Sequence, residues 1–350
     1  MYKLLIRPIL FLFKPETIHH FVIGMIKLFF RIVPVRRIVK SAFTVEDRHL
    51  EREVFGLKFR NPVGLAAGFD KDAGVYNELA DFGFSFVEVG TITPVAQPGN
   101  EKPRSFRLIK DKALINRMGF NNNGAAEAVD RLKRRKTDII IGGNIGKNTL
   151  TDNKDAARDY ALCFSELYDF VDYFAVNVSC PNISSLSELQ DRDELAAIIE
   201  QLAAIRKERS VRKPILIKIS PDLNEAQIDD VINIVQQYSL DGIIATNTSI
   251  ERNNLRADPA RLARIGTGGL SGVPIRERST QIIAYIYKQT SGTLPIIGVG
   301  GIMSARDAIE KLQAGASLVQ VYTGFIYDGP GLAKRINREI LKQKPSFSEL

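Results

Sequence analysis

Eight short apolar runs, each followed by a longer amphipathic stretch, alternate along most of this 350-residue chain. The runs are rich in Val, Ile and Phe, as buried strands are, and the stretches between them carry apolar residues at helical spacing. We expect strands at residues 63–67, 84–91, 139–145, 173–178, 215–219, 242–246, 296–299 and 318–322, and helices at 73–82, 122–135, 153–169, 190–209, 224–238, 275–290, 304–314 and 331–343. An α/β alternation repeated eight times favours a closed parallel (β/α)₈ barrel over an open doubly wound sheet.

Residue types at the ends of these segments support the same reading. Asn224 and Ser304 stand just before amphipathic stretches and are typical helix N-caps, and Gly315 is placed to end the second of these helices. Two β-rich runs meet at a glycine within residues 52–59 and predict a hairpin before the first barrel strand. A second hairpin is expected over residues 104–117, where it interrupts the second strand–helix unit.

Residues 1–40 form a distinct segment, because they hold eight basic side chains and one acid and so carry +7 of the net charge of +8. Two apolar runs, 4–13 and 16–33, are interrupted by charge and are shorter than the roughly 20 residues that cross a bilayer. Basic residues on apolar helices are typical of a segment that lies in an anionic membrane interface. We therefore expect a membrane-associating extension of two helices over 1–40 and a catalytic barrel over 41–350. The apolar face of the second helix consists of Ile18, Phe21, Val22, Met25, Ile26 and Phe29.

Three other readings of this segment remain open. A cleaved signal peptide needs an uninterrupted apolar region, which Arg7 and Lys14 break. A mitochondrial transit peptide shares the basic, acid-poor character, but the usual enrichment in Ser is missing. The third alternative is a pair of helices that only packs on the catalytic core.

Composition excludes several classes of function. Hydrophobic residues make up 45% and charged residues 25% of the chain, which is typical of a soluble globular protein. Beyond residue 40 the basic and acidic residues nearly balance, so nucleic-acid binding is not expected. The two cysteines, Cys163 and Cys180, are too few for a disulfide framework and lie far in sequence from all three histidines, so no metal site is expected.

Reactive groups in a (β/α)₈ barrel gather at the carboxyl ends of the strands, and here those ends are rich in carboxamides. Each carboxamide both donates and accepts a hydrogen bond, which suits a ring that bears alternating N–H and C=O groups. A single Asn at a strand end is usually a turn former, but five at one barrel mouth indicate a heterocycle. The five are Asn116, Asn144, Asn177, Asn182 and Asn247.

Glycine and lysine residues at the same ends suggest anion binding. Gly300, Gly301 and Gly324 follow the last two strands, where free backbone amides hold phosphate in this fold. No GxGxxG motif follows the first strand, which disfavours a nicotinamide nucleotide. Lys218 interrupts an apolar strand and requires an anion there, whereas Lys71 is also compatible with a lysine that reaches the surface.

Cys180 lies in the sequence NVSCPN, where a strand meets a polar loop. A thiolate that is desolvated and positioned there can accept a proton. Cys163, in the helical sequence YALCFSELY, is expected to be a small buried core residue. The residues alone leave both a catalytic and a structural role open for Cys180.

Together, the motifs resemble those of the dihydroorotate dehydrogenase family, the flavin enzymes of pyrimidine biosynthesis. GLAAGFDKD, EVGTITPVAQPGNEKPR, INRMGFNN, NVSCPN, IIATNTS, TGGLSG, IIGVGGI and ASLVQVYTG follow the family's order and spacing over essentially the whole chain. The resemblance implies a TIM barrel that oxidises (S)-dihydroorotate to orotate with FMN as the hydride acceptor. It implies FMN contacts from Ala67, Gly68, Phe69, Asp70, Lys71, Thr91, Asn144, Asn177, Lys218, Thr246, Gly272, Gly301, Tyr322 and Thr323, and substrate contacts from Lys71, Asn116, Arg117, Met118, Gly119, Phe120, Asn177, Asn182, Asn247 and Thr248.

The resemblance also implies the roles of the catalytic residues. Cys180 would take the proton from C5 of dihydroorotate while hydride leaves C6 for the flavin, and Lys218 would stabilise the negative charge on the reduced flavin. The helical extension and the sequence NRMGFNN are similar to the quinone-dependent class 2 branch. That branch usually has serine as its base, whereas cysteine, present here at position 180, is typical of the soluble class 1 branch.

Membership of the quinone-dependent branch would place the electron acceptor and the membrane on the same side of the barrel. It implies a quinone site near His19, Arg107 and Tyr322, and a peripheral location on the cytoplasmic side of the inner membrane, as a monomer or homodimer. Residues 1–40 would contact the anionic membrane surface. The alternatives are the same oxidation with a soluble acceptor such as fumarate, or a membrane-bound binding protein without catalysis.

Overall fold

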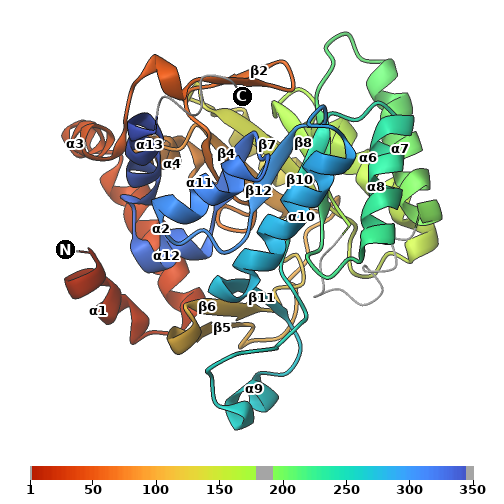
Figure 1. Cartoon of the computed structure of the whole chain (residues 1–350). Helices are drawn as coiled ribbons and strands as arrows, with labels where there is room; N and C mark the ends of the chain where they lie inside the picture. The colour runs from red at the N-terminus through yellow and green to blue at the C-terminus, as the bar shows by residue number, and fades with distance from the viewer. Residues whose placement is uncertain (1, 179–191, 344–350) are drawn as a thin grey trace.

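The computed structural model describes residues 2–178 and 192–343, and in it the eight expected strands close into one parallel barrel (Figure 1). They are β3 (Val63–Leu65), β4 (Phe86–Ile92), β7 (Ile140–Ile145), β8 (Tyr173–Asn177), β9 (Ile215–Ile219), β10 (Gly242–Ala245), β12 (Ile296–Val299) and β13 (Leu318–Val321). Each strand pairs with its neighbour in chain order, and β13 closes the barrel on β3 with Val319 opposite Val63. The (β/α)₈ barrel expected from the sequence is therefore confirmed.

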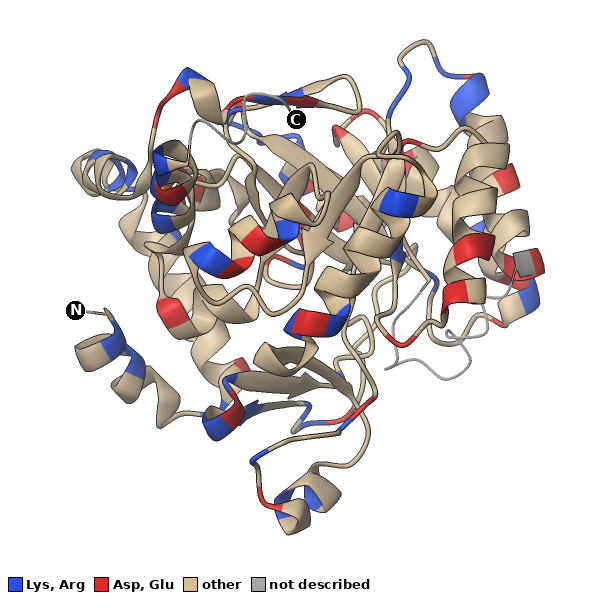
Figure 2. Ribbon diagram, viewed as in Figure 1, with Lys and Arg blue, Asp and Glu red and all other residues tan. Residues whose placement is uncertain are grey.

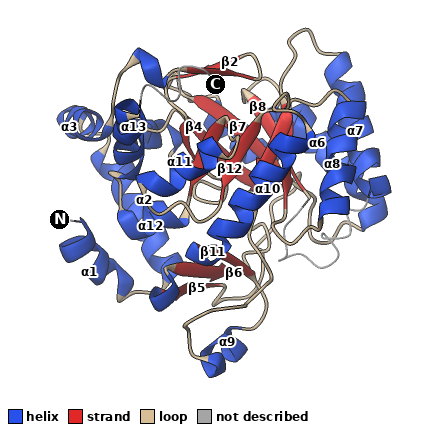
Figure 3. Cartoon of the chain, in the orientation of Figure 1, coloured by secondary structure: helices blue, strands red, loops and turns tan. Residues whose placement is uncertain are grey.

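Helices surround the barrel on its outer face (Figure 3). Those that the sequence predicted are α4 (Tyr76–Leu79), α5 (Ala125–Leu132), α6 (Ala156–Leu167), α7 (Arg192–Lys207), α8 (Glu225–Gln237), α10 (Arg276–Gln289), α11 (Ala305–Gln313) and α13 (Leu332–Lys342). Asn224 caps α8 in a capping box, and Ser304 accepts a hydrogen bond from a backbone N–H of α11, as expected. The sequence did not predict α9 (Pro259–Ile265) or α12 (Thr323–Asp328), because each is too short to show a helical period.

The amino-terminal end of the barrel is closed by the predicted hairpin of β1 (Arg52–Val54) and β2 (Leu57–Phe59). Phe59 of this hairpin packs against Phe86 in the barrel interior, with 5.3 Å between the ring centroids. The Phe86 ring occupies the space beside Gly64, where a Cβ would lie 2.4 Å from it. Because apolar side chains fill this end of the barrel, a polar ligand site is expected only at the carboxyl end of the strands.

At the opposite end, the second predicted hairpin forms part of a three-stranded sheet (Figure 1). Its strands β5 (Ser105–Leu108) and β6 (Ala113–Asn116) are joined by β11 (Gly269–Gly272), which pairs antiparallel with β6. The sequence did not predict β11, since the run GLSG has no strand propensity of its own and is extended only through pairing. This sheet rises beside the carboxyl ends of the barrel strands.

The amino-terminal extension contains one helix more than the two expected. It consists of a short π-helix at Tyr2–Ile6 that leads into α1 (Arg7–Phe11), followed by α2 (Pro15–Phe29) and α3 (Val33–Phe43). The third helix arises because Pro34 ends the previous helical run and is tolerated in the first turn of a new one. Among the described residues, no single helix is long and apolar enough to cross a membrane, and α2 and α3 reach that length and composition only as a pair bent by 115°.

The extension is docked on the barrel and also exposes apolar side chains. Arg104 donates to the Glu16 carboxylate of α2 at 2.8 Å, and Arg36 of α3 donates to Asp81 at 2.5 Å. Basic side chains lie on α1 and α3 (Figure 2). The exposed large apolar residues of the extension are Leu4, Leu5, Ile6, Ile9, Leu12, Phe13, Phe21, Met25, Leu28, Phe29, Ile32, Val33 and Ile38. The extension thus packs on the core but leaves many of its large apolar side chains exposed.

Candidate active site

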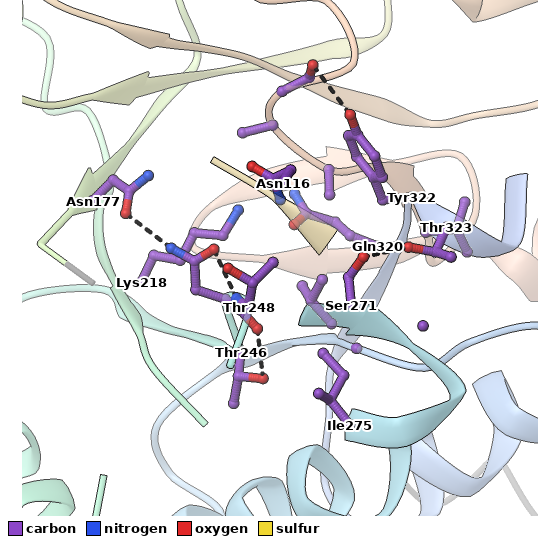
Figure 4. Close-up of a pocket in the computed structure, with 18 of the residues that line it drawn as sticks. Asn116, Asn177, Lys218, Thr246, Thr248, Ser271, Ile275, Gln320, Tyr322 and Thr323 are labelled. Atoms are coloured by element: carbon purple, nitrogen blue, oxygen red, sulfur yellow. Dashed lines mark hydrogen bonds between the residues drawn. The ribbon is translucent and has the colours of Figure 1, made fainter. Parts of the chain in front are cut away.

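A cavity with about 1010 Å³ of empty space, its open mouth included, lies at the carboxyl ends of the barrel strands (Figure 4). The sequence-predicted residues that line it come from seven of the eight strand ends, from β6 and the residues that follow it, and from β11. They are Ala67, Gly68, Lys71, Thr91, Asn116, Met118, Gly119, Phe120, Asn177, Lys218, Thr246, Asn247, Thr248, Gly272, Gly300, Gly301, Tyr322, Thr323 and Gly324. The fold therefore brings together most of the residues that the strand ends indicated.

A buried ion pair supports the floor of the cavity. Lys218 of β9 donates from Nζ to Oε1 of Glu88 on β4 at 3.0 Å, and the Glu88 side chain is fully buried. This pair explains how a lysine is accommodated inside a barrel strand, because the carboxylate supplies the anion that its burial requires. The sequence analysis missed Glu88, although it is the one acid in the apolar run FVEVG and mirrors Lys218 in ILIKI.

Glu88 also collects neutral donors from the barrel interior. Its carboxylate accepts from Asn144 Nδ2 at 2.8 Å, from Gln320 Nε2 at 2.8 Å and from the hydroxyl of Tyr173 at 3.3 Å. Burial, together with the negative Glu88 carboxylate, raises the pKa of Tyr173 well above its ordinary value. The carboxylate is thus held by the lysine and three further donors, so its position and that of Lys218 are fixed together.

A row of amide and hydroxyl groups crosses the cavity from Thr91 to Asn247. Asn177 donates from Nδ2 to Thr91 Oγ1 at 2.9 Å, and Thr91 donates to Asn144 Oδ1 at 2.5 Å. Asn247 donates in turn to Asn177 Oδ1 at 3.2 Å, the contact drawn beside Asn177 in Figure 4. These bonds set the amide orientations before any ligand binds, which lowers the entropy lost on binding a planar polar ring.

The glycine-rich ends of β12 and β13 leave no room for side chains. A Cβ on Gly301, whose φ is +71°, would lie 2.3 Å from Arg276 Cβ, and a Cβ on Gly324 would lie 2.0 Å from the Ile302 carbonyl. Next to these loops the hydroxyls of Ser271 and Thr323 are 2.8 Å apart. Exposed backbone amides with two hydroxyls form a donor set suited to a phosphate.

Lys71 lines the cavity from the first strand end rather than extending over the surface. Its Nζ donates to the Gly68 carbonyl at 2.6 Å. Burial lowers the pKa of Lys71 to about 8, and the nearby Asp72 carboxylate opposes this shift. The hydroxyl of Tyr322 lies 3.4 Å from the same carbonyl, and burial raises the pKa of Tyr322 to about 12. At neutral pH the cavity thus holds a charged lysine and a neutral phenol.

Several predicted residues use their side chains elsewhere. Asp70 accepts from the backbone N–H groups of Gly74 and Val75 and so fixes the turn after the first strand end. Arg117 donates to the Ile265, Thr267 and Pro103 carbonyls. Phe69 and Asn144 also do not line the cavity, since the first packs against His19 and the second lies beneath the amide row. Cys180 and Asn182 fall outside the described residues.

The three residues predicted for a quinone site come from the extension (His19), the second hairpin (Arg107) and the cavity wall (Tyr322). The imidazole of His19 on α2 packs edge-on against Phe69, at 5.0 Å between centroids, and Phe69 lies 6.1 Å from the Tyr322 ring. Burial lowers the pKa of His19 to about 3, so this ring is neutral at physiological pH. Arg107 donates to the Phe11 and Phe13 carbonyls and therefore holds the link between α1 and α2.

Comparison with known proteins decides the family. The family model described as dihydroorotate dehydrogenase matches residues 49–343. The chain belongs to the dihydroorotate dehydrogenase family. A relative from Christiangramia forsetii, dihydroorotate dehydrogenase (quinone), is 54% identical over 343 residues, which cover 98% of this chain and 99% of the relative. An enzyme of the same name from Nocardia farcinica is 44% identical over 338 residues, which cover 97% and 91%.

A solved structure of a dihydroorotate dehydrogenase from Eimeria tenella, in complex with ferulenol, is similar with a TM-score of 0.83. It is 37% identical, and the match covers 95% of this chain and 92% of that chain. Coverage of 95% of the chain means that the match includes part of the amino-terminal extension. A ligand-free structure of the same Eimeria enzyme matches with a TM-score of 0.81 and the same identity.

Dihydroorotate dehydrogenases use FMN, and the cavity of this family member fits that cofactor. The glycine loops of β12 and β13 offer backbone donors where an added Cβ would collide with the chain. Within residues 2–178 and 192–343, Gln320 Oε1 is buried without a hydrogen-bond partner, and Gln320 lines the cavity. A buried acceptor without a partner costs about 1–3 kcal/mol, so a ligand N–H at this point would relieve it. Neither Gln320 nor Ser271 was predicted from the sequence.

Proposed function

We propose that this chain oxidises dihydroorotate to orotate with FMN and a membrane quinone, as a step of pyrimidine biosynthesis. One cavity combines the three features that support this proposal. They are the buried Lys218–Glu88 pair, the hydrogen-bonded row of amides from Thr91 to Asn247, and the glycine loops suited to a phosphate. When bound, FMN takes up two electrons from the substrate and passes them on to the quinone. The residues of the chain supply binding, orientation and proton transfer.

Lys71 and the amide row are proposed to hold dihydroorotate. The Lys71 ammonium pairs with the substrate carboxylate, and Asn116, Asn177 and Asn247 pair with the N–H and C=O groups of its ring. The stretch of residues 117–120 and Asn182 and Thr248 complete the proposed substrate contacts. Since the amides are already oriented by hydrogen bonds to each other, the ring is received in one pose, which favours aligned reaction.

Lys218 and the strand-end residues are proposed to hold FMN. The Lys218 ammonium, fixed by Glu88, provides positive charge where electrons accumulate, and this electrostatic stabilisation requires no reorganisation during the reaction. The loops of Gly301 and Thr323 would hold the FMN phosphate. The other proposed contacts that line the cavity are Ala67, Gly68, Lys71, Thr91, Asn177, Thr246, Gly272 and Tyr322. Phe69, Asp70 and Asn144 do not line the cavity and are proposed to support these contacts.

Cys180 is proposed to accept the proton from C5 of dihydroorotate. Replacing it with alanine should lower the rate of flavin reduction by dihydroorotate by at least about 100-fold, the contribution typical of a general base, while FMN stays bound. Cys163 provides the matched control, because it is fully buried with its thiol directed to the Ile92 carbonyl. If Cys180→Ala reduces its flavin as fast as Cys163→Ala does, Cys180 is not the base.

The amino-terminal extension is proposed to receive the quinone and to lie on the anionic membrane surface. Its apolar residues remain exposed although the segment is docked, and the rings of His19, Phe69 and Tyr322 are in successive edge contact from α2 to the cavity. The basic residues of 1–40 would then face lipid headgroups on the cytoplasmic side of the inner membrane.

Steady-state assays separate this acceptor from a soluble one. Deletion of residues 1–40 should abolish orotate formation with a quinone, while turnover with a soluble redox dye and the bound flavin content are retained. Binding to anionic vesicles should be lost with the same deletion, and neutral vesicles serve as the control. Unchanged quinone kinetics in the truncated protein, or faster turnover of the full chain with fumarate than with quinone, would overturn the quinone assignment.

A further inference from the structure

A second buried lysine lies behind the glycine loops and takes no part in the site described so far. Lys311 of α11 is fully buried. Its Nζ donates to Ser279 Oγ at 3.0 Å, to Thr280 Oγ1 at 3.1 Å and to the Arg276 carbonyl at 3.4 Å. All three acceptors are neutral groups in the first turns of α10. Among the described residues, no carboxylate forms an ion pair with Lys311.

The nearest acids are committed to other groups or face outward. Asp307, one turn earlier in α11, accepts from Arg276 Nη1 at 2.8 Å and from the Met303 backbone N–H at 3.0 Å. Glu310 is only partly buried. Burial therefore dominates and lowers the pKa of Lys311 to about 7, although both acids act in the opposite direction. With this pKa a fully buried amine with neutral partners is only partly charged at pH 7, and an anion nearby would favour its ammonium form.

The contacts of Lys311 lead directly to the proposed phosphate loops. Ser279, which accepts from Lys311, donates from Oγ to the Val299 carbonyl at 2.5 Å. The next two residues, Gly300 and Gly301, pack closely against the same turn of α10. A Cβ on Gly300 would lie 3.0 Å from Ser279, and a Cβ on Gly301 would lie 2.3 Å from Arg276. Val299, Gly300 and Gly301 all line the cavity. The Ser279 hydroxyl is thus the only group between the Lys311 ammonium and the Val299 carbonyl along this path of hydrogen bonds.

We propose that Lys311 is a positioning residue for the cofactor phosphate: it holds the first turn of α10 against the loop of Val299–Gly301 and adds a positive field behind that loop. This inference rests on the proposed function, since it requires FMN in the cavity. The ammonium does not replace the backbone amides that contact the phosphate. It makes their surroundings more positive, and in a buried site with little solvent such a field acts on a dianion with little screening.

The test compares FMN with riboflavin, which has the same ring system and no phosphate. Flavin-free protein is titrated with each flavin, and the dissociation constants are measured by the change in flavin fluorescence. Lys311→Met keeps the aliphatic stem and removes the charge. We expect its dissociation constant for FMN to rise on the order of tenfold, with that for riboflavin unchanged, so that the preference for the phosphorylated flavin falls by the same factor.

Lys311→Gln provides a second variant that retains a donor toward Ser279 and therefore preserves the packing if the methionine variant does not fold. It should lose the same preference, because the charge and not the hydrogen bond acts on the phosphate. Lys147→Met is the matched control: Lys147 is also buried, but it donates to the Thr151 carbonyl and does not line the cavity. It should leave the ratio of the two dissociation constants unchanged.

The outcomes separate this inference from the proposed function. Equal weakening of FMN and riboflavin, or an unchanged ratio in both Lys311 variants, would mean that Lys311 only stabilises the fold and would overturn the proposal while the function stands. A wild-type protein that binds neither flavin would overturn both. A loss confined to the phosphorylated flavin, in the Lys311 variants alone, is the result expected.

Discussion

Removing either member of the buried Lys218–Glu88 pair should destabilise the protein about as much as removing both. The two charged atoms are 3.0 Å apart, and the side chains are 6% and 0% exposed. At an effective dielectric constant of 20, two unit charges at that separation attract each other by about 5.5 kcal/mol. Solvent entering the open cavity screens part of this, so we expect Lys218→Met or Glu88→Gln to cost about 3 kcal/mol each, in line with other broken buried pairs.

The assay is a double-mutant cycle followed by urea unfolding of the flavin-free protein. The double variant should lose about 3 kcal/mol rather than about 6, because no unpaired charge remains in the barrel, which gives a coupling energy of about 3 kcal/mol. The exposed pair of Lys133 and Asp130 is the matched control, with the same 3.0 Å separation and side chains 56% and 65% exposed. Its coupling should stay below about 1 kcal/mol. Additive costs at the buried pair would refute the reasoning.

Three further predictions address the other parts of the site. The pKa of Lys71 is lowered to about 8, so its ammonium form predominates only below that pH. The affinity of the flavin-loaded enzyme for orotate should therefore fall as the pH rises above about 8. A Lys71→Met variant whose orotate affinity falls in the same way would contradict the role of Lys71. Gly301→Ala places a methyl group 2.3 Å from Arg276 Cβ at a φ of +71°, so the loop must shift and the purified variant should carry much less FMN than wild type. A normal flavin content would exclude a close approach of the cofactor to this loop. Glu16→Gln removes the charge by which Arg104 holds α2 at 2.8 Å, and it should raise the KM for quinone with little change in the KM for dihydroorotate. The control Glu46→Gln, outside the cavity and this ion pair, should change neither KM.

The barrel was predictable because its signal is repeated. Buried parallel strands read as apolar runs whatever their partners, and the turn residues between them are local, so all eight strands lie within a few residues of their predicted positions. The elements that were missed depend on tertiary contacts. β11 is extended only because it pairs with β6, and the six-residue α12 has too few residues to show a helical period.

In the candidate site, too, residues with a local sequence signal were predicted and those whose role depends on tertiary contacts were not. Lys218 stood out because a lysine interrupts an apolar strand, and the asparagines stood out because they end strands. Glu88 carries the same signal in β4, but its partner is 130 residues away, and only the closed barrel shows that the two meet. The roles of Lys311 and Gln320 could not be predicted, since a lysine in an amphipathic helix and a glutamine in a strand usually reach solvent.

The most direct measurement of the central claim is an anaerobic titration of the purified yellow protein with dihydroorotate, followed by absorbance. The account predicts that a stoichiometric amount of dihydroorotate bleaches the flavin and releases orotate, and that the colour returns on addition of a quinone but not of fumarate. A flavin that stays oxidised with dihydroorotate, or a preparation without flavin absorbance, would contradict it.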